Sequence, residues 1–255
     1  MSLFAAKNSR DRNPETLLRC TFRGYSADTR GACRIETFGE YKTLVVDRFD
    51  RRLANGGKWW LRLPQEDFCQ VTGTPSALKY ENDGGPGIRK IMDLLLGSER
   101  AAEDRRDFIR TRLVFWLLAA IDGHAKNFSI FLLPGGAFRL TPRYDILSAY
   151  PMIGHGRGRL SPQKITMAMA VEGKNRHHHW NGIRLRHWLE TAKRCGVPQM
   201  ETIVRDILEQ TPLVLDGVRD MIAGKFPEAI ASSVLDGVKT AATQLRQEFA
   251  ASLLS

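Results

Sequence analysis

Cysteine is scarce in this chain, and its spacing excludes the usual cysteine-based sites. The four cysteines are Cys20, Cys33, Cys69 and Cys195, and no two of them form a Cys-x-x-Cys pair. Zinc ribbons and disulfide frameworks normally show close, regular cysteine spacing. We therefore expect four reduced thiols and no zinc ribbon.

Long hydrophobic segments are also missing. The longest uninterrupted apolar run spans residues 113–121, whereas a helix that crosses a bilayer needs about 20 apolar residues. The first residues include Lys7, Arg10 and Arg12 but no apolar segment behind them, which is not the pattern of a signal peptide. These features predict a cytoplasmic protein that has no membrane partner.

Negative charge is in short supply relative to positive charge. The 255 residues contain 38 Lys and Arg against 28 Asp and Glu, which gives a net charge of +10. A basic balance favours an anionic partner such as a nucleotide or a nucleic acid. Arginines that only keep the surface soluble would give the same balance, so charge leaves both interpretations open.

The distribution of apolar residues predicts an α+β fold that is mainly α. Residues 1–32 are polar and lack a sustained apolar period, so we expect an irregular segment there. Residues 43–49 have the composition of a buried strand and residues 59–63 that of a second extended segment. Pro64 followed by Gln65–Asp67 is typical of a helix start.

Most of the remaining chain has the composition of helices, interrupted by one hairpin. The second of two adjacent helices ends in a segment that is apolar on all sides, as expected for a helix buried in the middle of a domain. A short hairpin around Pro134–Gly136 follows it. The expected helices span residues 88–96, 99–120, 182–195, 200–209, 213–223 and 226–254, and the hairpin strands span 128–133 and 137–140.

Three polar residues around this hairpin carry the clearest chemical signal. Asp122 and Asn127 have the D-x-x-x-x-N spacing of a protein-kinase catalytic loop, and Asp145 follows the hairpin, where a kinase places a metal-binding aspartate. Phosphoryl transfer to a hydroxyl needs a carboxylate near that hydroxyl and oxygen ligands for magnesium. The spacing by itself also fits an aspartate that caps a turn and an asparagine in a loop. The order of buried helix, motif, hairpin and second aspartate is more specific.

Several segments in order resemble the HipA family of toxin kinases from bacterial toxin–antitoxin modules. DGHAKNFSIF (122–131) and RLTPRYDILSAYP (139–151) are similar to the family's catalytic and metal-binding segments. LVVDRFDRR (44–52) resembles its hinge, and LPQEDFCQVTG (63–73) and KYENDGGPG (79–87) resemble its next blocks. The resemblance runs from about Cys33 to the C-terminus. It implies a segment 1–32 outside the family and a protein-kinase-like C-lobe in residues 33–255, with a short hinge β-segment and most of the N-lobe missing.

The resemblance also implies roles for individual residues. Asp122 would be the catalytic base, and Asn127 and Asp145 would hold Mg²⁺. The hinge residues Asp47, Arg48 and Phe49 would meet the adenine of ATP through main-chain groups. Within the loop, His124 could brace the backbone and Lys126 could neutralise phosphate charge, although a core histidine and a solvated lysine are equally good interpretations.

The start of the chain departs from the family. About 46 residues precede the hinge, and they contain no G-x-G-x-x-G and no lysines except Lys7 and Lys42, neither of which is a convincing phosphate-binding strand lysine. The sequence therefore predicts a protein serine/threonine kinase that is impaired. The alternative is an inactive remnant that binds an antitoxin or DNA. A metal-dependent phosphohydrolase would leave the hinge unexplained.

The family resemblance implies a HipB-like antitoxin partner, an unknown protein substrate, and operator DNA bound together with the antitoxin. One predicted helix is strongly basic, which fits either a contact with the DNA backbone or a solvated face. Its basic residues are Arg184, Arg186, His187, Lys193 and Arg194. The run His177–His179 is better explained as a polar loop than as a metal site, because adjacent histidines point in different directions.

Overall fold

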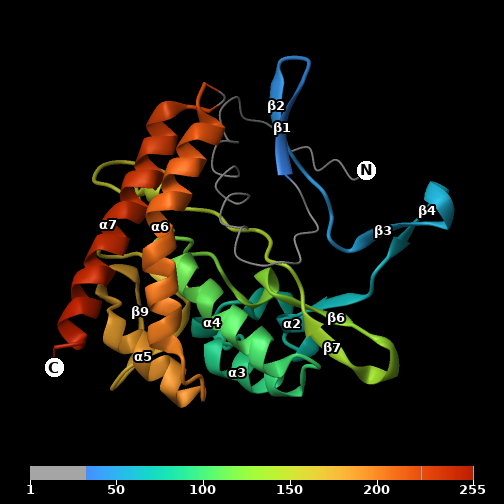
Figure 1. The fold of residues 1–255 in the computed structure, drawn as a ribbon, viewed down its shortest axis with the longest axis horizontal. Helices are drawn as coiled ribbons and strands as arrows, with labels where there is room; N and C mark the ends of the chain where they lie inside the picture. Colours follow the sequence, from blue (N-terminus) through green and yellow to red (C-terminus); the bar gives the residue numbers. More distant parts are fainter. Residues whose placement is uncertain (1–32, 225, 255) are drawn as a thin grey trace.

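The computed structural model describes residues 33–224 and 226–254, and the predicted irregular segment 1–32 lies outside the described residues. Two separate antiparallel hairpins come first. Strands β1 (Cys33–Phe38) and β2 (Tyr41–Val46) form one, and β3 (Arg51–Ala54) and β4 (Trp59–Arg62) form the other. Figure 1 shows both hairpins extending away from the helical body. The division into 1–32 and 33–255 remains a prediction.

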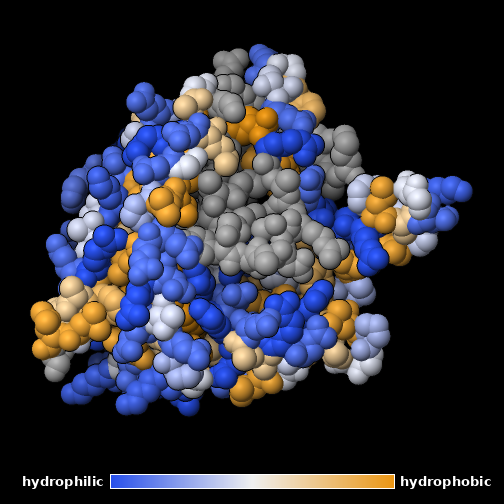
Figure 2. All heavy atoms as spheres, in the orientation of Figure 1, coloured by the Kyte–Doolittle hydropathy of each residue, from blue (hydrophilic) through white to orange (hydrophobic). Residues whose placement is uncertain are grey.

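The prediction of a buried strand at residues 43–49 is wrong in two respects. The strand ends at Val46, and Val46 keeps 42% of its surface exposed. Among the described residues β2 pairs only with β1, so no further strand of a larger sheet shields it from solvent. The β3–β4 hairpin exposes apolar side chains as well, and Figure 2 shows hydrophobic surface on this hairpin. These side chains are Leu53, Trp59, Trp60 and Leu61.

A three-stranded antiparallel sheet links the extended part of the chain to the helices. Its order is β5 (Gln65–Asp67), β6 (Ser129–Leu132), β7 (Phe138–Leu140), so the predicted hairpin around Pro134–Gly136 is confirmed. The predicted helix start at Pro64–Asp67 is wrong, because these residues pair with β6. Helix α2 (Phe68–Val71) begins one residue later, with Asp67 as its N-cap and Gln70 completing a capping box.

The helical body surrounds helix α4 (Ala101–Leu117), whose side chains are buried along most of its length. The other helices are α3 (Ile88–Leu94), α5 (Leu185–Arg194), α6 (Met200–Ile222) and α7 (Glu228–Ser252). Helices α6 and α7 pack side by side along one edge of the molecule (Figure 1). None of the helices in the described part of the chain is long and apolar enough to cross a membrane.

Helix α6 is continuous where the sequence predicts two helices separated at residues 210–212. Pro212 lies inside it and cannot donate the backbone hydrogen bond that the carbonyl of Leu208 would normally accept. Arg246 of α7 fills this place, because its Nη2 donates to the Leu208 carbonyl over 2.7 Å. The neighbouring helix thus satisfies the group that the proline leaves without a donor.

A further hairpin, β8 (Thr166–Glu172) and β9 (Arg176–His179), lies in a region expected to be mainly helical. Strand β8 is buried on both faces, and its alternate N–H groups bond outside its own hairpin. Ala168 donates to the Ile121 carbonyl, Ala170 to the Glu81 carboxylate and Glu172 to the Thr191 hydroxyl. The strand is therefore held by tertiary contacts that the sequence pattern does not reveal. The predicted polar loop at His177–His179 is also corrected, because these residues form β9.

Candidate active site

The loop after α4 carries the predicted catalytic residues, and three neighbours hold its backbone. Nη1 of Arg112 in α4 donates to the Gly123 carbonyl over 2.7 Å, and the N–H of Ala168 in β8 donates to the Ile121 carbonyl over 2.9 Å. Gly123 also lies so close to α4 that an added Cβ would come within 2.4 Å of the Phe115 ring. These contacts fix the position of the loop relative to the buried helix and β8.

Arg112 is a fully buried cation behind this loop. Its guanidinium lies over the rings of Phe115 and Phe128, at 5.6 and 5.8 Å from their centres. Burial lowers the pKa of Arg112 to about 10, while the Glu81 carboxylate acts in the opposite direction. Arg112 therefore stays charged at neutral pH. Sequence reasoning missed this residue because it is one of four arginines in α4, and the sequence pattern does not show which of them is fully buried.

The polar residues of the loop form one connected cluster with Asp145. His124 Nε2 lies 3.9 Å from Asp122 Oδ2, and the His124 N–H donates to Asn127 Oδ1 over 3.0 Å. The Asn127 amide in turn donates to Asp145 Oδ2 over 2.8 Å. The structure thus brings together four of the predicted site residues, from both sides of the β6–β7 hairpin.

The cluster combines buried and open groups. His124 and Asn127 are buried, whereas the Asp122 side chain is 53% exposed. Burial lowers the pKa of His124, although the nearby Asp122 carboxylate acts to raise it. A neutral histidine that braces the loop is consistent with these surroundings. The half-exposed Asp122 carboxylate remains accessible to a substrate.

Asp145 has a backbone conformation that L-residues rarely adopt, with φ = 56°. Its neighbour Tyr144 anchors it, because the Tyr144 hydroxyl donates to the Lys126 carbonyl over 2.8 Å and also contacts the Ser129 hydroxyl. Burial raises the pKa of Tyr144 well above its usual range, so the phenol stays protonated. Backbone strain of this kind concentrates at functional sites, where the surroundings impose it.

The three predicted hinge residues have different surroundings. Phe49 stacks on Tyr144, with ring centres 5.6 Å apart, and therefore packs next to the segment that carries Asp145. Arg48 forms two hydrogen bonds with the buried carboxylate of Asp50. Asp47 is exposed, 3.3 Å from Arg34. Within the described part of the chain, Phe49 is the hinge residue whose contact reaches the segment of the cluster.

Lys126 is turned toward a different carboxylate from those of the cluster. Its Nζ lies 2.9 Å from Asp67 Oδ2, at the N-terminus of α2. This ion pair ties the loop of residues 122–127 to the β5–α2 corner. A role in phosphate neutralisation, which remains a prediction, would require Lys126 to exchange this partner for the phosphate.

The donor set of the cluster fits magnesium better than zinc. Asp145 offers carboxylate oxygen and Asn127 amide oxygen, and Mg²⁺ is commonly held by one or two carboxylates together with substrate phosphates. The described residues contain no group of three or more His, Cys, Asp or Glu side chains that could hold a metal by themselves. In the run His177–His179, His177 stacks on His187 with ring centres 3.8 Å apart.

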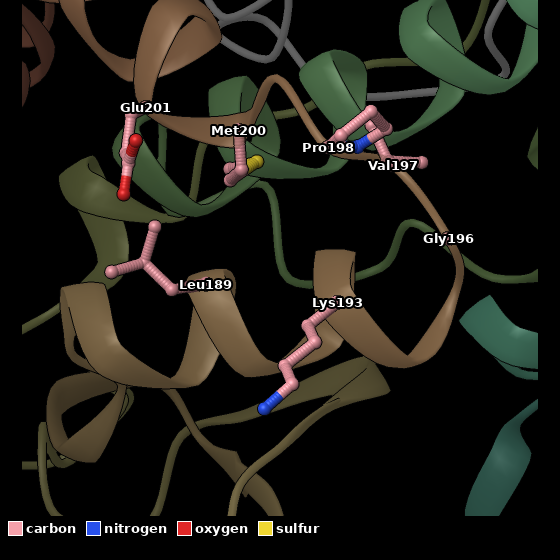
Figure 3. A pocket seen from close by; sticks show the side chains of 7 residues that line it. All are labelled: Leu189, Lys193, Gly196, Val197, Pro198, Met200 and Glu201. Atoms are coloured by element: carbon pink, nitrogen blue, oxygen red, sulfur yellow. The ribbon is translucent and has the colours of Figure 1, made fainter.

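Two of the four cationic side chains of the predicted basic helix, Arg184 and Arg194, pair with carboxylates of the protein. Arg194 pairs with Glu172 and Glu190, Arg184 lies 3.5 Å from Glu248, and His187 is buried. A groove of about 610 Å³ separates α5 from the start of α6 (Figure 3). It contains none of the cluster residues, and it is lined by Leu189, Lys193, Gly196, Val197, Pro198, Met200 and Glu201. These arrangements favour the solvated-face interpretation of α5.

The fold itself is that of a protein kinase. The chain superposes on HipA from Shewanella oneidensis, solved in a complex with HipB and operator DNA, with a TM-score of 0.72 and 21% identity, over 93% of this chain and 55% of that one. The Helicobacter pylori proinflammatory kinase CtkA matches with a TM-score of 0.53 and 9% identity, over 95% and 86% of the two chains. The predicted α+β, kinase-like architecture is thus confirmed.

Sequence comparison then assigns the family. The HipA-like C-terminal domain matches residues 28–214, and the chain belongs to this family. It is 31% identical to the putative kinase Y4mE of Sinorhizobium fredii, over 71% of this chain and 45% of that protein. It is 33% identical to the serine/threonine-protein kinase toxin HipA of S. oneidensis, over 44% and 28%. The aligned sequence therefore covers less than half the length of each of these two curated relatives.

Proposed function

We propose that Asp122, Asn127 and Asp145 form the phosphoryl-transfer centre of an ATP- and Mg²⁺-dependent protein serine/threonine kinase. The observation that carries this proposal is the continuous cluster that runs from Asp122 through His124 and Asn127 to Asp145. It unites an accessible carboxylate with two oxygen donors suited to magnesium. The kinase toxin named among the relatives supports the same chemistry.

The proposed roles follow from these positions. Asp122 accepts the proton of a serine or threonine hydroxyl, and Asn127 and Asp145 hold the magnesium that neutralises the phosphates of ATP. Phe49 and its neighbours Asp47 and Arg48 border the adenine. A HipB-like antitoxin and operator DNA are proposed partners, because the solved HipA structure contains both.

The test is phosphate transfer from labelled ATP to a cell extract, with Asp122→Asn compared against the unmodified chain. We expect Asp122→Asn to reduce transfer by about 10²–10⁴-fold, the usual contribution of a catalytic base. Asp236→Asn on the exposed side of α7 is a matched control that should leave transfer unchanged. If both variants retain the rate of the unmodified chain, the transfer does not come from this site, and the remnant that binds an antitoxin or DNA becomes the better interpretation.

A further inference from the structure

Asp122 has a hydrogen-bond donor that the proposed catalytic roles leave unused. The hydroxyl of Tyr80 donates to Asp122 Oδ1 over 2.6 Å, across a separation of 42 residues in the chain. The other carboxylate oxygen, Oδ2, is the one that lies 3.9 Å from His124 Nε2. The two oxygens of Asp122 therefore have different surroundings: one is occupied by a phenol, and the other borders the imidazole.

Tyr80 is itself held firmly against the catalytic loop. Its ring meets the His124 ring edge to face, with centres 5.2 Å apart. Its carbonyl accepts hydrogen bonds from the N–H groups of Asp83 and Gly85, at 3.1 and 2.8 Å. The tight turn after it needs glycine, because a Cβ at Gly85 would lie 2.4 Å from the Leu78 carbonyl oxygen. The turn therefore fixes the backbone from which the phenol reaches Asp122.

The residue after Tyr80 fixes the same segment to β8. Glu81 accepts a hydrogen bond from the Ala170 N–H over 2.6 Å and lies 3.3 Å from Arg176. A Cβ at Gly87 would collide with the Glu81 carboxylate at 2.2 Å. The glycines of the KYENDGGPG segment thus let the chain fold closely around Glu81, and Tyr80 is presented to Asp122 from a rigid support.

We propose that Tyr80 is a positioning residue for the catalytic carboxylate. By holding Oδ1, the phenol restricts rotation of the Asp122 carboxylate and leaves Oδ2 to receive the substrate hydroxyl. This inference rests on the proposed kinase function and names a further residue of its site. During transfer, the substrate oxygen bonds to the γ-phosphorus, the bond between that phosphorus and the β,γ-bridging oxygen breaks, ADP leaves, and the hydroxyl proton passes to Oδ2.

The phenol of Tyr80 can donate a hydrogen bond to Asp122 at neutral pH because it stays protonated there. The hydrogen bond to Asp122 is the main cause that raises the pKa of Tyr80 to about 12, and burial adds to it. Tyr80 therefore remains protonated, and a hydrogen-bond donor, at neutral pH. A phenol of this kind orients a base without competing with it for the proton.

The experiment compares Tyr80→Phe with Tyr41→Phe, a matched control on the exposed β1–β2 hairpin. In steady-state transfer from ATP, we expect Tyr80→Phe to lower kcat by about tenfold, less than loss of the base itself, with KM for ATP unchanged. Tyr41→Phe should change neither constant. An unchanged kcat would overturn the proposal. An increased kcat would also overturn it, because it would mean that the phenol blocks the base.

A second readout tests the pairing without any activity. In a chain that carries ¹³C at the tyrosine ζ carbon, NMR between pH 7 and pH 10.5 should show that Tyr80 does not titrate, and Asp122→Asn should bring its pKa down toward about 10. If Asp122→Asn leaves the pKa of Tyr80 unchanged, the proposal is overturned. If the chain transfers no phosphate but the titration behaves as expected, the proposed function fails and the pairing stands.

Discussion

The stacked pair of His177 and His187 shows how burial sets the charge of a single residue. The rings lie 3.8 Å apart and nearly parallel, so protonation of one places a charge against the other. The pKa of His187 is lowered to about 4, first by burial and then by His177, Arg186 and Arg184, against a smaller opposing effect of Glu248. His187 is therefore neutral in the folded protein at pH values where it is charged in the unfolded chain.

This difference predicts a loss of stability in mild acid. Between pH 6.5 and about pH 4 the unfolded state binds a proton at His187 that the folded state does not, so the free energy of unfolding should fall as the pH falls through this window. We expect the contribution of His187 to be roughly 1–3 kcal/mol. Urea denaturation at pH 7 and pH 5 measures it.

The control for this prediction separates His187 from other acid-sensitive groups. His187→Gln should show a smaller difference in stability between pH 7 and pH 5 than the unmodified chain. His155→Gln, in an exposed glycine-rich loop, should show the same difference as the unmodified chain. Equal pH dependence in all three proteins would contradict the assignment to His187.

At the scale of elements, helix α6 depends on its neighbour α7 for one hydrogen bond. Leu208 is buried, and its carbonyl has no backbone donor four residues later because Pro212 lacks an N–H. The carbonyl accepts a hydrogen bond from the Arg246 guanidinium instead. A buried carbonyl without a donor costs about 1–3 kcal/mol. The arginine therefore compensates for a proline in the other helix.

This arrangement predicts that the two substitutions are coupled. Arg246→Met should lower the free energy of unfolding by about 1–3 kcal/mol, because it leaves the Leu208 carbonyl unsatisfied. Pro212→Ala restores an N–H in α6, so Arg246→Met should cost less in that background. A double-mutant cycle by urea denaturation gives the coupling, and strictly additive effects would show that Arg246 acts elsewhere.

At the scale of the molecule, the described chain has a well-packed helical body and two hairpins with little cover. The core of the body is built around α4 and includes Trp188, Phe108 and Leu113, all fully buried. The hairpins are separate two-stranded sheets, and apolar side chains of β3 and β4 are exposed. The proposed catalytic cluster belongs to the body, so its geometry does not depend on the hairpins.

We predict that the 255-residue chain by itself transfers phosphate slowly. The residues before the hinge contain no glycine-rich loop and no convincing strand lysine to clamp the β- and γ-phosphates. Loss of even one such electrostatic contact commonly costs about 10²–10³ in rate. Parallel assays should find kcat/KM for ATP at least that much lower than in full-length HipA of S. oneidensis, and a comparable value would show that the C-lobe suffices.

The sequence could predict the elements and residues whose signals are local. The hairpin around Pro134–Gly136 follows from its turn residues, and the buried end of α4 follows from its apolar composition. The spacing of Asp122, Asn127 and Asp145 around that hairpin predicts that they lie close together, and the structure shows the contact of Asn127 with Asp145. Strand β8 gave no such signal, because its Met and Ala residues are not typical of strands and its hydrogen bonds go to distant groups.

The sequence by itself thus determined the family and the mainly helical class, because both depend on short-range pattern and order. Only the tertiary structure decided how that loop is supported. The contacts of Arg112 with Gly123 and of Tyr80 with Asp122 join segments that are separate in the chain. So does the ion pair of Lys126 with Asp67. The packing of the whole chain determines these partners. A buried charged or polar group needs a hydrogen-bond partner, and the sequence pattern does not show which distant residue will lie close enough to provide it.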